Sequence, residues 1–454
     1  MRSIRLLCTS VLLGLWTCSA LAADWKVGIA RVDITPEKPV WMAGYAARDH
    51  LPEGTIHPLW AKALAIEDSA GSRLVVVTTD LIGMPRELGD AVCARAKKST
   101  GIDRGRVLLN FSHTHCGPVV LACAPVAYGL TSEQHADAEA YARTLQDKLV
   151  KLIEAASADL RPARLAYGEG KATFAINRRA RRTLKNGEQV DRSALVPVDH
   201  SVPVLQVTDA QGKLAAVLFG YACHNTTTPI YHYNGDYAGY AQIALEAAHP
   251  GATALFMIGC GGDSNPDPRG KIELAEQHGK SLAAAVDKAL AGELQPVGGR
   301  LSAAYEVVDL PVVDPPTRKE LEERRGQGNK YDQRLTERLL ARLEKEGSIP
   351  ATVPCPIQVV RFGEDLSIVA IAGEAVIDYA LRLKEEFAGE RLWVASYSNS
   401  VPAYIPSERV LKEGGYEGAT AMVYFGIHGP FRPGVEDRVV GAVRRLMDLC
   451  RHRN

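Results

Sequence analysis

The order of short apolar runs and helical patterns is the feature that most constrains the fold of this chain. The runs RLVVVTTDLIG (73–83) and RVLLNFSH (106–113) have the length of buried strands, and PRELGDAVCARAKK (85–98) between them has helical spacing. The same order recurs in KLAAVLFGYACH (213–224), a helical segment near Tyr237 to His249, and ATALFMIGCGGD (252–263). Strand, helix and strand at this spacing are typical of a sheet covered by helices on its faces. The sequence therefore predicts an α/β fold.

A later stretch has a different pattern. VPCPIQVVRFGEDLSIVAIAGEAV (353–376) contains two apolar runs joined by Gly-Glu-Asp, which is typical of a β-hairpin. A hairpin beside parallel strands makes the sheet mixed, so we expect a large mixed β-sheet core flanked by helices. No repeat, low-complexity linker or Pro/Gly/Ser-rich boundary interrupts residues 23–454, and we expect one domain over that range.

Residues 315–347 depart from this alternation because they are rich in Lys, Arg and Glu. The latter half of the segment places four leucines on one helical face, which predicts an amphipathic helix or a helical pair: Leu335, Leu339, Leu340 and Leu343. Two interpretations remain open. The insertion is either a surface hairpin that packs on the body of the protein or a lid over its functional site.

The first 22 residues have the composition of a secretory signal peptide. Arg2 and Arg5 precede an apolar run that ends in Ala20-Leu21-Ala22, an A-x-A-like cleavage site. We therefore expect cleavage near Ala22-Ala23 and an exported protein, either periplasmic or secreted. The alternative is an N-terminal membrane anchor. No later run is apolar for long enough to cross a bilayer, so we expect no transmembrane segment in the mature chain.

Charge and cysteine content exclude several classes of protein. The chain has 53 Lys and Arg against 53 Asp and Glu, which argues against a nucleic-acid or anionic-membrane partner. Seven cysteines follow the leader: Cys93, Cys116, Cys123, Cys223, Cys260, Cys355 and Cys450. Although Cys116 and Cys123 are close enough in sequence to form a bridge, the number is odd and no CxxC motif occurs. We expect small buried side chains rather than a disulfide framework.

Polar side chains follow several of the apolar runs at the point where each run ends. They are Asp80, His113, His115, His224, Asp263 and Glu374. Because ligand sites of open α/β sheets collect where strands end, their shared position points to one site. Each residue alone has a simpler explanation. The histidines suit turns or the core, Asp263 suits a helix N-cap, and Glu374 suits the start of a helix, where the helix dipole favours a carboxylate.

The pair His113 and His115 favours metal chemistry. Alternation on an extended chain puts both imidazoles on the same side, so either both bind one metal ion or one binds metal while the other faces substrate. Neutral imidazoles with a carboxylate suit a zinc ion that keeps an open coordination position. No thiolate cluster, Walker-type loop, GxSxG elbow or GxGxxG motif competes. Among the other histidines, His57 in GTIHPLWAKAL is the one to follow.

Six stretches, in this order, resemble the neutral/alkaline non-lysosomal ceramidase family, specifically its N-terminal catalytic domain. They are VGIARVDITP (27–36), MAGYAARD (42–49), HPLWAKALAIED (57–68), SHTHCGP (112–118), INRR (176–179) and GDYAGYA (235–241). The DITP opening together with SHTHCGP is the most specific combination. The resemblance implies a zinc amidase, since enzymes of this family cleave the N-acyl bond of ceramide.

The resemblance also implies roles for single residues. In the family's THTHSGP element the first histidine binds zinc and the second faces the substrate. The first histidine corresponds to His113 here, and the second corresponds to His115. A further zinc histidine falls on His224. The zinc glutamate of a PGE element falls on Glu374, and the zinc tyrosine falls on Tyr404 in NSVPAYI.

Other family positions match only in part. An Asn-Arg pair contacts the substrate in the family, and Arg178 in INRR is its candidate here. The family's GDVSPN element reads GDSNPD (262–267), so Asn265 stands where the family has serine, and Cys116 replaces the serine of HSGP. The spacing from His224 to Glu374 is shorter than in ceramidases, and no counterpart of the family's C-terminal sandwich domain is expected. These features predict a short, divergent bacterial-type member.

The predicted activity is hydrolysis of a linear N-acyl amide by a metal-activated water, with one zinc ion per chain. His115 and Arg178 would stabilise the oxyanion or the leaving group, and Asp263 would orient a ligand histidine. The substrate would be a small or lipid-like N-acyl compound.

Two alternatives to this activity remain. One is hydrolysis of an ester, lactone or phosphoester at the same site, where phosphoester chemistry ranks lower because it usually uses two metals. The other is a non-catalytic protein that binds a glycan or lipid. The sequence leaves the oligomeric state open.

Overall fold

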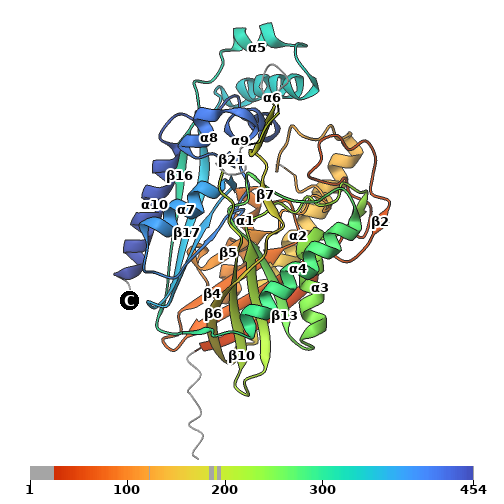
Figure 1. Ribbon diagram of the computed structural model, residues 1–454. Helices are drawn as coiled ribbons and strands as arrows, with labels where there is room; N and C mark the ends of the chain where they lie inside the picture. The colour runs from red at the N-terminus through yellow and green to blue at the C-terminus, as the bar shows by residue number, and fades with distance from the viewer. Residues whose placement is uncertain (1–24, 122, 184–188, 192–195, 453–454) are drawn as a thin grey trace, which may run out of the picture.

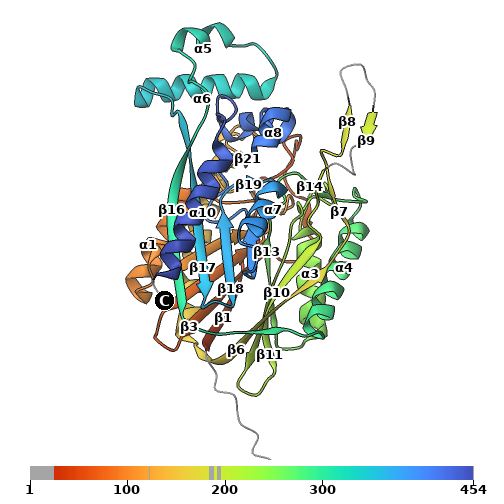
Figure 2. The ribbon, with the colours of Figure 1, turned by 60° about the vertical axis from the view of Figure 1, so that its left-hand side comes forward.

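The computed structural model describes residues 25–121, 123–183, 189–191 and 196–452. The expected signal peptide therefore lies outside the described residues. Two β-sheets pack face to face, and helices cover the outer face of each (Figures 1 and 2). The expectation of a large mixed sheet flanked by helices is confirmed.

The larger sheet has nine strands. Along the sheet they run β13 (Thr253–Ile258), β11 (Leu214–Tyr221), β10 (Ser201–Asp209), β6 (Arg161–Lys171), β1 (Trp25–Asp33), β3 (Trp60–Asp68), β4 (Arg73–Thr79) and β5 (Val107–Phe111), with β15 (Gln295–Val297) paired to β6. The two predicted strand–helix–strand units lie at its two ends. There β4 pairs in parallel with β5 and β11 with β13, whereas the strands between them are antiparallel.

The smaller sheet corrects one detail of the prediction. The hairpin of residues 353–376 forms as predicted, but it belongs to a separate four-stranded sheet: β16 (Leu301–Pro311), β17 (Thr352–Phe362), β18 (Leu366–Ile371) and β20 (Leu392–Ala395). Apolar run lengths indicate strands but not which strands pair, because pairing depends on contacts distant in sequence.

Helices cover each sheet on one side. On the larger sheet lie α1 (Arg86–Thr100), α2 (Ser132–Ala158), α3 (Asp236–Ala248) and α4 (Ile272–Leu290), and on the smaller sheet α7 (Ile377–Glu386) and α10 (Val435–Arg451). The sequence of strand β5 is continuously apolar because both of its faces are buried. Leu108 packs in the core between the sheets, while Val107 and Leu109 pack in the core under the helices.

The ends of three strands meet at Asn110 of β5, which is fully buried. Its Oδ1 accepts a hydrogen bond from the backbone N of Ile258 at the end of β13 (3.0 Å), and its Nδ2 donates to the carbonyl of Ser396, just after β20 (2.8 Å). The two end strands of the larger sheet and one strand of the smaller sheet therefore finish at the same place.

The charged segment 315–347 forms a helical pair, α5 (Arg318–Arg324) and α6 (Lys330–Glu346), with its own small core of Leu321, Leu339, Leu340 and Ile349. Helix α6 rests on the body of the protein at the top of Figure 1, where Tyr331 Oη donates to the carbonyl of Ala46 (3.0 Å). Next to it lie α8 (Glu408–Glu413), α9 (Gly415–Gly418) and η2 (Thr420–Phe425).

The remaining elements are short. They are η1 (Arg104–Arg106) and the two-stranded pairs β2 (Gly54–Thr55) with β12 (His232–Tyr233), β7 (Ala175–Asn177) with β14 (Ser264–Pro266), β8 (Arg181–Thr183) with β9 (Gln189–Asp191), and β19 (Glu374–Ala375) with β21 (Tyr404–Ile405).

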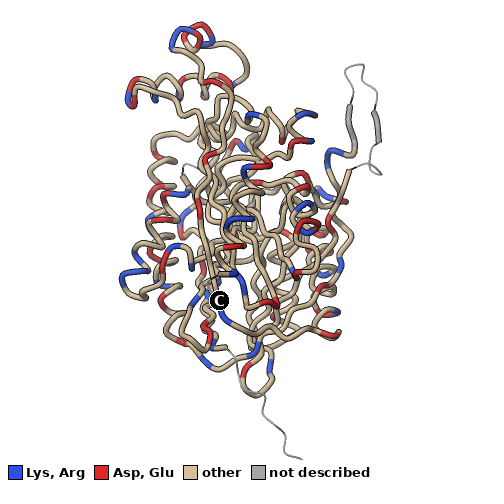
Figure 3. The backbone as a smooth tube through the Cα atoms, turned by 90° about the vertical axis from the view of Figure 1, so that its left-hand side faces the viewer, with Lys and Arg blue, Asp and Glu red and all other residues tan. Residues whose placement is uncertain are grey.

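The prediction about the cysteines is confirmed. All seven are buried, and the described part of the chain contains no disulfide. Within the same residues, no helix combines the length and the apolar character that crossing a bilayer requires. Basic and acidic residues are interspersed along the described backbone (Figure 3).

Candidate metal centre

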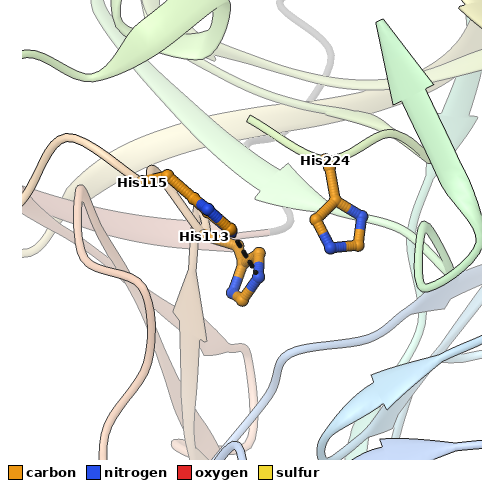
Figure 4. A group of neighbouring side chains, drawn as sticks. All are labelled: His113, His115 and His224. Atoms are coloured by element: carbon orange, nitrogen blue, oxygen red, sulfur yellow. Dashed lines mark hydrogen bonds between the residues drawn. The ribbon is translucent and has the colours of Figure 1, made fainter. Parts of the chain in front are cut away.

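His113 and His115 meet through a turn and not through an extended strand. Strand β5 ends at Phe111, and His113 adopts a φ of 62°, a left-handed conformation that non-glycine residues rarely take. The predicted extended alternation is therefore wrong, because the left-handed residue redirects the chain. The Nε2 atoms of the two imidazoles nevertheless lie 3.2 Å apart, and Figure 4 shows both rings beside His224.

Backbone carbonyls fix the tautomers of His113 and His224. The Nδ1 of His113 bonds to the carbonyl oxygen of Ile82 (2.6 Å), and the Nδ1 of His224 bonds to that of Gly261 (2.7 Å). A carbonyl oxygen only accepts, so each Nδ1 carries the hydrogen and each neutral ring presents a bare Nε2. Burial, followed by the charge of Arg178, lowers the pKa of His224 to about 4, which keeps this ring neutral near pH 7.

Glu374 and Tyr404 lie on the side of the smaller sheet. They are paired with each other in the short β19–β21 ladder. Gly373 makes this approach possible. Its φ is 77°, and a Cβ there would lie 2.6 Å from the carbonyl oxygen of Ala403. The Oε2 of Glu374 lies 3.2 Å from His113 Nε2 and 3.0 Å from His224 Nε2, and Tyr404 Oη lies 3.2 Å from His224 Nε2.

The donor atoms of this cluster fit a metal ion. In the neutral form of both rings, two bare imidazole nitrogens face one carboxylate oxygen at 3.0–3.2 Å, and a cation among them relieves the repulsion between their lone pairs. Ligands of a tetrahedral ion bound at about 2.0–2.1 Å are about 3.3 Å apart, which is close to these separations.

The structure also places His115 where it could reach an ion held by this cluster, since one donor atom from each of His113, His115 and His224 lies within 4.8 Å of the others. His115 differs in one respect, because its Nδ1 is buried without a hydrogen-bond partner among the described residues. Burial and the neighbouring His113 and His224 lower the pKa of His115 well below its usual value, so this ring is neutral.

Arg178 forms one wall of the centre. Its Nε bonds to Glu417 Oε1 (2.6 Å) and its Nη2 donates to the carbonyl of Gly262 (2.8 Å). The guanidinium carbon lies 5.5 Å from the ring centre of Tyr404. Asn265 is adjacent, with its Oδ1 3.5 Å from Arg178 Nη1. Both predicted residues therefore lie at the site, and Arg178 is held in place by an acidic partner.

Asp263 does not orient His224, so this prediction is wrong. Its carboxylate accepts hydrogen bonds from the backbone N of Ile377 (3.0 Å), the first residue of α7, and from Asn177 Nδ2 (2.8 Å). Burial raises its pKa to about 6. The expectation that Glu374 opens a helix is also wrong, because the helix begins three residues later and Asp263 occupies the start of α7 instead.

Two pockets adjoin the centre. An apolar pocket of about 220 Å³ is lined by His113 and Glu374 together with Ile82, Ala127, Val401 and Phe425. A charged pocket of about 530 Å³ is lined by Arg178, Arg179, Arg269, Glu413 and Glu417. Both pockets share Gly44, Tyr45, His115, Tyr404 and Tyr416, so they meet beside His115.

Sequence reasoning missed Tyr397, whose Oη lies 3.5 Å from His224 Nδ1 and whose ring centre lies 4.5 Å from that of His113. Tyr397 follows the apolar strand β20, so the rule that selected the other residues would have found it. Two candidates lie elsewhere. His57 Nε2 accepts a hydrogen bond from the backbone of Gly235, and Asp80 accepts one from the backbone of Trp60.

This fold and cluster define an α/β protein of two packed sheets with a buried histidine–carboxylate centre that could hold a metal ion. Residues 25–334 match the family model described as neutral/alkaline non-lysosomal ceramidase, N-terminal. The chain belongs to this family.

Similar proteins agree with that assignment. The chain is 33% identical over 274 residues to the neutral ceramidase of Pseudomonas aeruginosa, a match that covers 58% of this chain and 40% of the relative. It is 24% identical over 477 residues to the neutral ceramidase of Mycobacterium tuberculosis, covering 87% of this chain and 74% of the relative. The alignment with the Pseudomonas protein thus spans less than half of that protein's length.

Solved structures show the same fold. The crystal structure of neutral ceramidase from Pseudomonas aeruginosa superposes with a TM-score of 0.71 at 24% identity, covering 93% of this chain and 75% of that one. A structure titled as a ceramidase complexed with C2 gives a TM-score of 0.70 at 22% identity, with 93% and 76% of the two chains covered.

Proposed function

We propose that the protein is a zinc-dependent amidohydrolase that cleaves an N-acyl bond. The observation that carries this proposal is the convergence of the bare Nε2 atoms of His113 and His224 on the Oε2 of Glu374. Two histidines and one glutamate are a ligand set of catalytic zinc sites that keep a position open. Membership of the ceramidase family supports an amide as the bond cleaved.

The proposed ligands are His113, His224, Glu374 and Tyr404. Metal-bound histidines almost always donate their second nitrogen to a carbonyl or carboxylate, as His113 and His224 do here. Among the described residues, the Nδ1 of His115 has no such partner, which favours a role toward the substrate. Zinc in this position would supply Lewis acidity, polarising a carbonyl group and acidifying a water molecule.

The protein's own residues then move protons and position charge. Amide hydrolysis requires a proton on the departing nitrogen, because an amide anion is a poor leaving group. The neutral His115 ring lies where both pockets meet and can take a proton from water and pass it to that nitrogen. Arg178, held by Glu417, adds positive charge to the wall where the oxyanion develops.

Metal analysis combined with activity measurements tests this proposal. The purified protein should contain one zinc ion per chain and hydrolyse N-acyl amides, and a chelator should abolish the activity. The double variant His113→Ala, His224→Ala should lose the zinc. As a matched control, His278→Gln changes a buried histidine of α4 that bonds to the carbonyl of Pro268, and it should keep the zinc. Undiminished amide hydrolysis by metal-free protein would contradict the proposal.

A further inference from the structure

Among the residues that the structure describes, the charged pocket contains one arginine without an ion-pair partner. Arg178 and Arg179 both pair with Glu417, and Arg179 also pairs with Glu413. Arg269 lines the same pocket and has no ion-pair or hydrogen-bond partner among the residues that the structure describes. The three arginines and two glutamates of the lining thus leave a formal charge of +1, which Arg269 carries.

Two buried polar atoms of this pocket also lack partners. Thr226 is 5% exposed, and its Oγ1 has no hydrogen-bond partner among the described residues. The Nδ1 of His115 is likewise buried without a hydrogen-bond partner among the described residues. A buried polar atom without a partner costs free energy, so such atoms in a pocket wall favour a polar ligand.

The apolar pocket on the other side of His115 has a small volume. Its volume of about 220 Å³ exceeds by a modest margin the roughly 150 Å³ of a cavity that holds benzene. Helix α6 borders it on one side, where the ring of Tyr331 packs on Tyr424 of the pocket wall with ring centres 5.0 Å apart. This volume suits a short acyl chain.

These features disfavour two long alkyl chains. An amide with a long chain on each half would place one chain in the apolar pocket and the other against Arg178, Arg179 and Arg269. Leaving a cation against hydrocarbon is unfavourable, whereas a carboxylate there forms an ion pair.

Resting on the proposed function, we propose that the substrate is a short-chain N-acyl amino acid. Its acyl chain lies in the apolar pocket, and its carboxylate pairs with Arg269 and accepts a hydrogen bond from Thr226. Hydrolysis adds water across the C–N bond. The acyl carbon gains the oxygen of the water and leaves as a carboxylate, and the nitrogen takes both protons of the water and leaves as the ammonium group of the free amino acid.

The test compares two amides that differ only in the charge of the amine half, N-hexanoylglycine and N-hexanoylethanolamine, on the zinc-loaded full-length protein. We expect kcat/KM for the glycine amide to be at least about tenfold higher. Because Arg269 is exposed, Arg269→Ala should reduce this preference about fivefold through KM, and Arg269→Glu should reverse it. The control Arg318→Ala changes an exposed arginine of α5 that does not line the pocket, and it should keep the preference.

A second pair of variants isolates the hydroxyl group. Thr226→Val should lower the preference for the glycine amide. Thr228→Val should not, because this equally buried hydroxyl, also without a partner among the described residues, does not line the pocket.

The outcomes separate this inference from the proposed function. Hydrolysis of both amides without preference, or a preference unchanged by Arg269→Ala, overturns the inference alone. Hydrolysis of neither amide contradicts the proposed function. In that case, calorimetry measures the binding of the same two compounds and decides the inference. Tighter binding of the glycine amide, with the difference reduced in Arg269→Ala, supports it. Equal binding of the two compounds overturns it.

Discussion

The position of His115 depends on a glycine that touches it. Gly44 has a φ of 95°, and a Cβ there would lie 2.4 Å from the Cβ and Cγ of His115. We expect Gly44→Ala to displace the imidazole and lower kcat at least about tenfold, because proton transfer needs the ring in place. The zinc content should not change. Gly71→Ala is the control, since Gly71 has a similar φ of 81° but open space around it. Equal kinetics of the two variants would contradict this role.

Asp263 gives the stability of the fold a defined pH dependence. Burial raises its pKa to about 6, whereas the unfolded chain releases the proton near about pH 3.9. The stabilisation that the protonated Asp263 gives the folded state is therefore fully present below about pH 4 and is lost as the pH rises to about 6. The free energy of unfolding falls by up to about 3 kcal/mol over this range. Urea unfolding between pH 4 and pH 7 should show this decline in the native protein relative to Asp263→Asn, which cannot titrate. Parallel pH profiles of the two proteins would refute it.

Among the elements, helix α6 controls the outer wall of the apolar pocket. Tyr331 bonds to the carbonyl of Ala46 and packs on Tyr424, and both of these residues line the pocket. We expect Tyr331→Ala to raise KM for N-hexanoyl amides about fivefold, from the loss of one aromatic contact and one hydrogen bond. The value of kcat should not change, because Tyr331 does not line either pocket beside His115. Tyr331→Phe should have the smaller effect, and two variants with unchanged KM would exclude this role.

At the scale of the whole molecule, the proposed metal ion joins the two sheets. His113 and His224 follow strands β5 and β11 of the larger sheet, whereas Glu374 and Tyr404 belong to the β19–β21 bridge beside the smaller one. An ion that binds only the folded chain adds about 2.7 kcal/mol at a free concentration one hundred times its Kd. For a protein of this size we expect a chelator to lower Tm by about 3 °C.

Calorimetry with and without chelator measures this shift. The double variant His113→Ala, His224→Ala should show no further shift with chelator. A Tm that does not depend on metal in the native protein would argue against an ion that links the sheets.

The two sheets also share one continuous core, which includes Leu108, Met257 and Ile368, so we propose that residues 25–452 form a single domain.

Much of the fold follows from the sequence because it depends on local patterns. Apolar runs and helical spacing identified both parallel strand–helix–strand units, the 353–376 hairpin and the helical character of residues 315–347. The abrupt change from apolar to polar residues at strand ends selected His113, His224 and Glu374 without any knowledge of pairing. Family motifs then added Tyr404 and Arg178.

The tertiary structure decided how these parts meet. Strands β5 and β11 are far apart in the order of the larger sheet, and Glu374 follows a strand of another sheet. Adjacent strands rotate by roughly 20–25°, and this twist accumulates across the eight strands from β13 to β5 until these end strands meet at Asn110. The left-handed turn at His113, the histidine carbonyl partners and the unbalanced Arg269 also depend on contacts between distant segments. The sequence by itself determined which side chains can bind a metal ion, and long-range packing determined that they share one site.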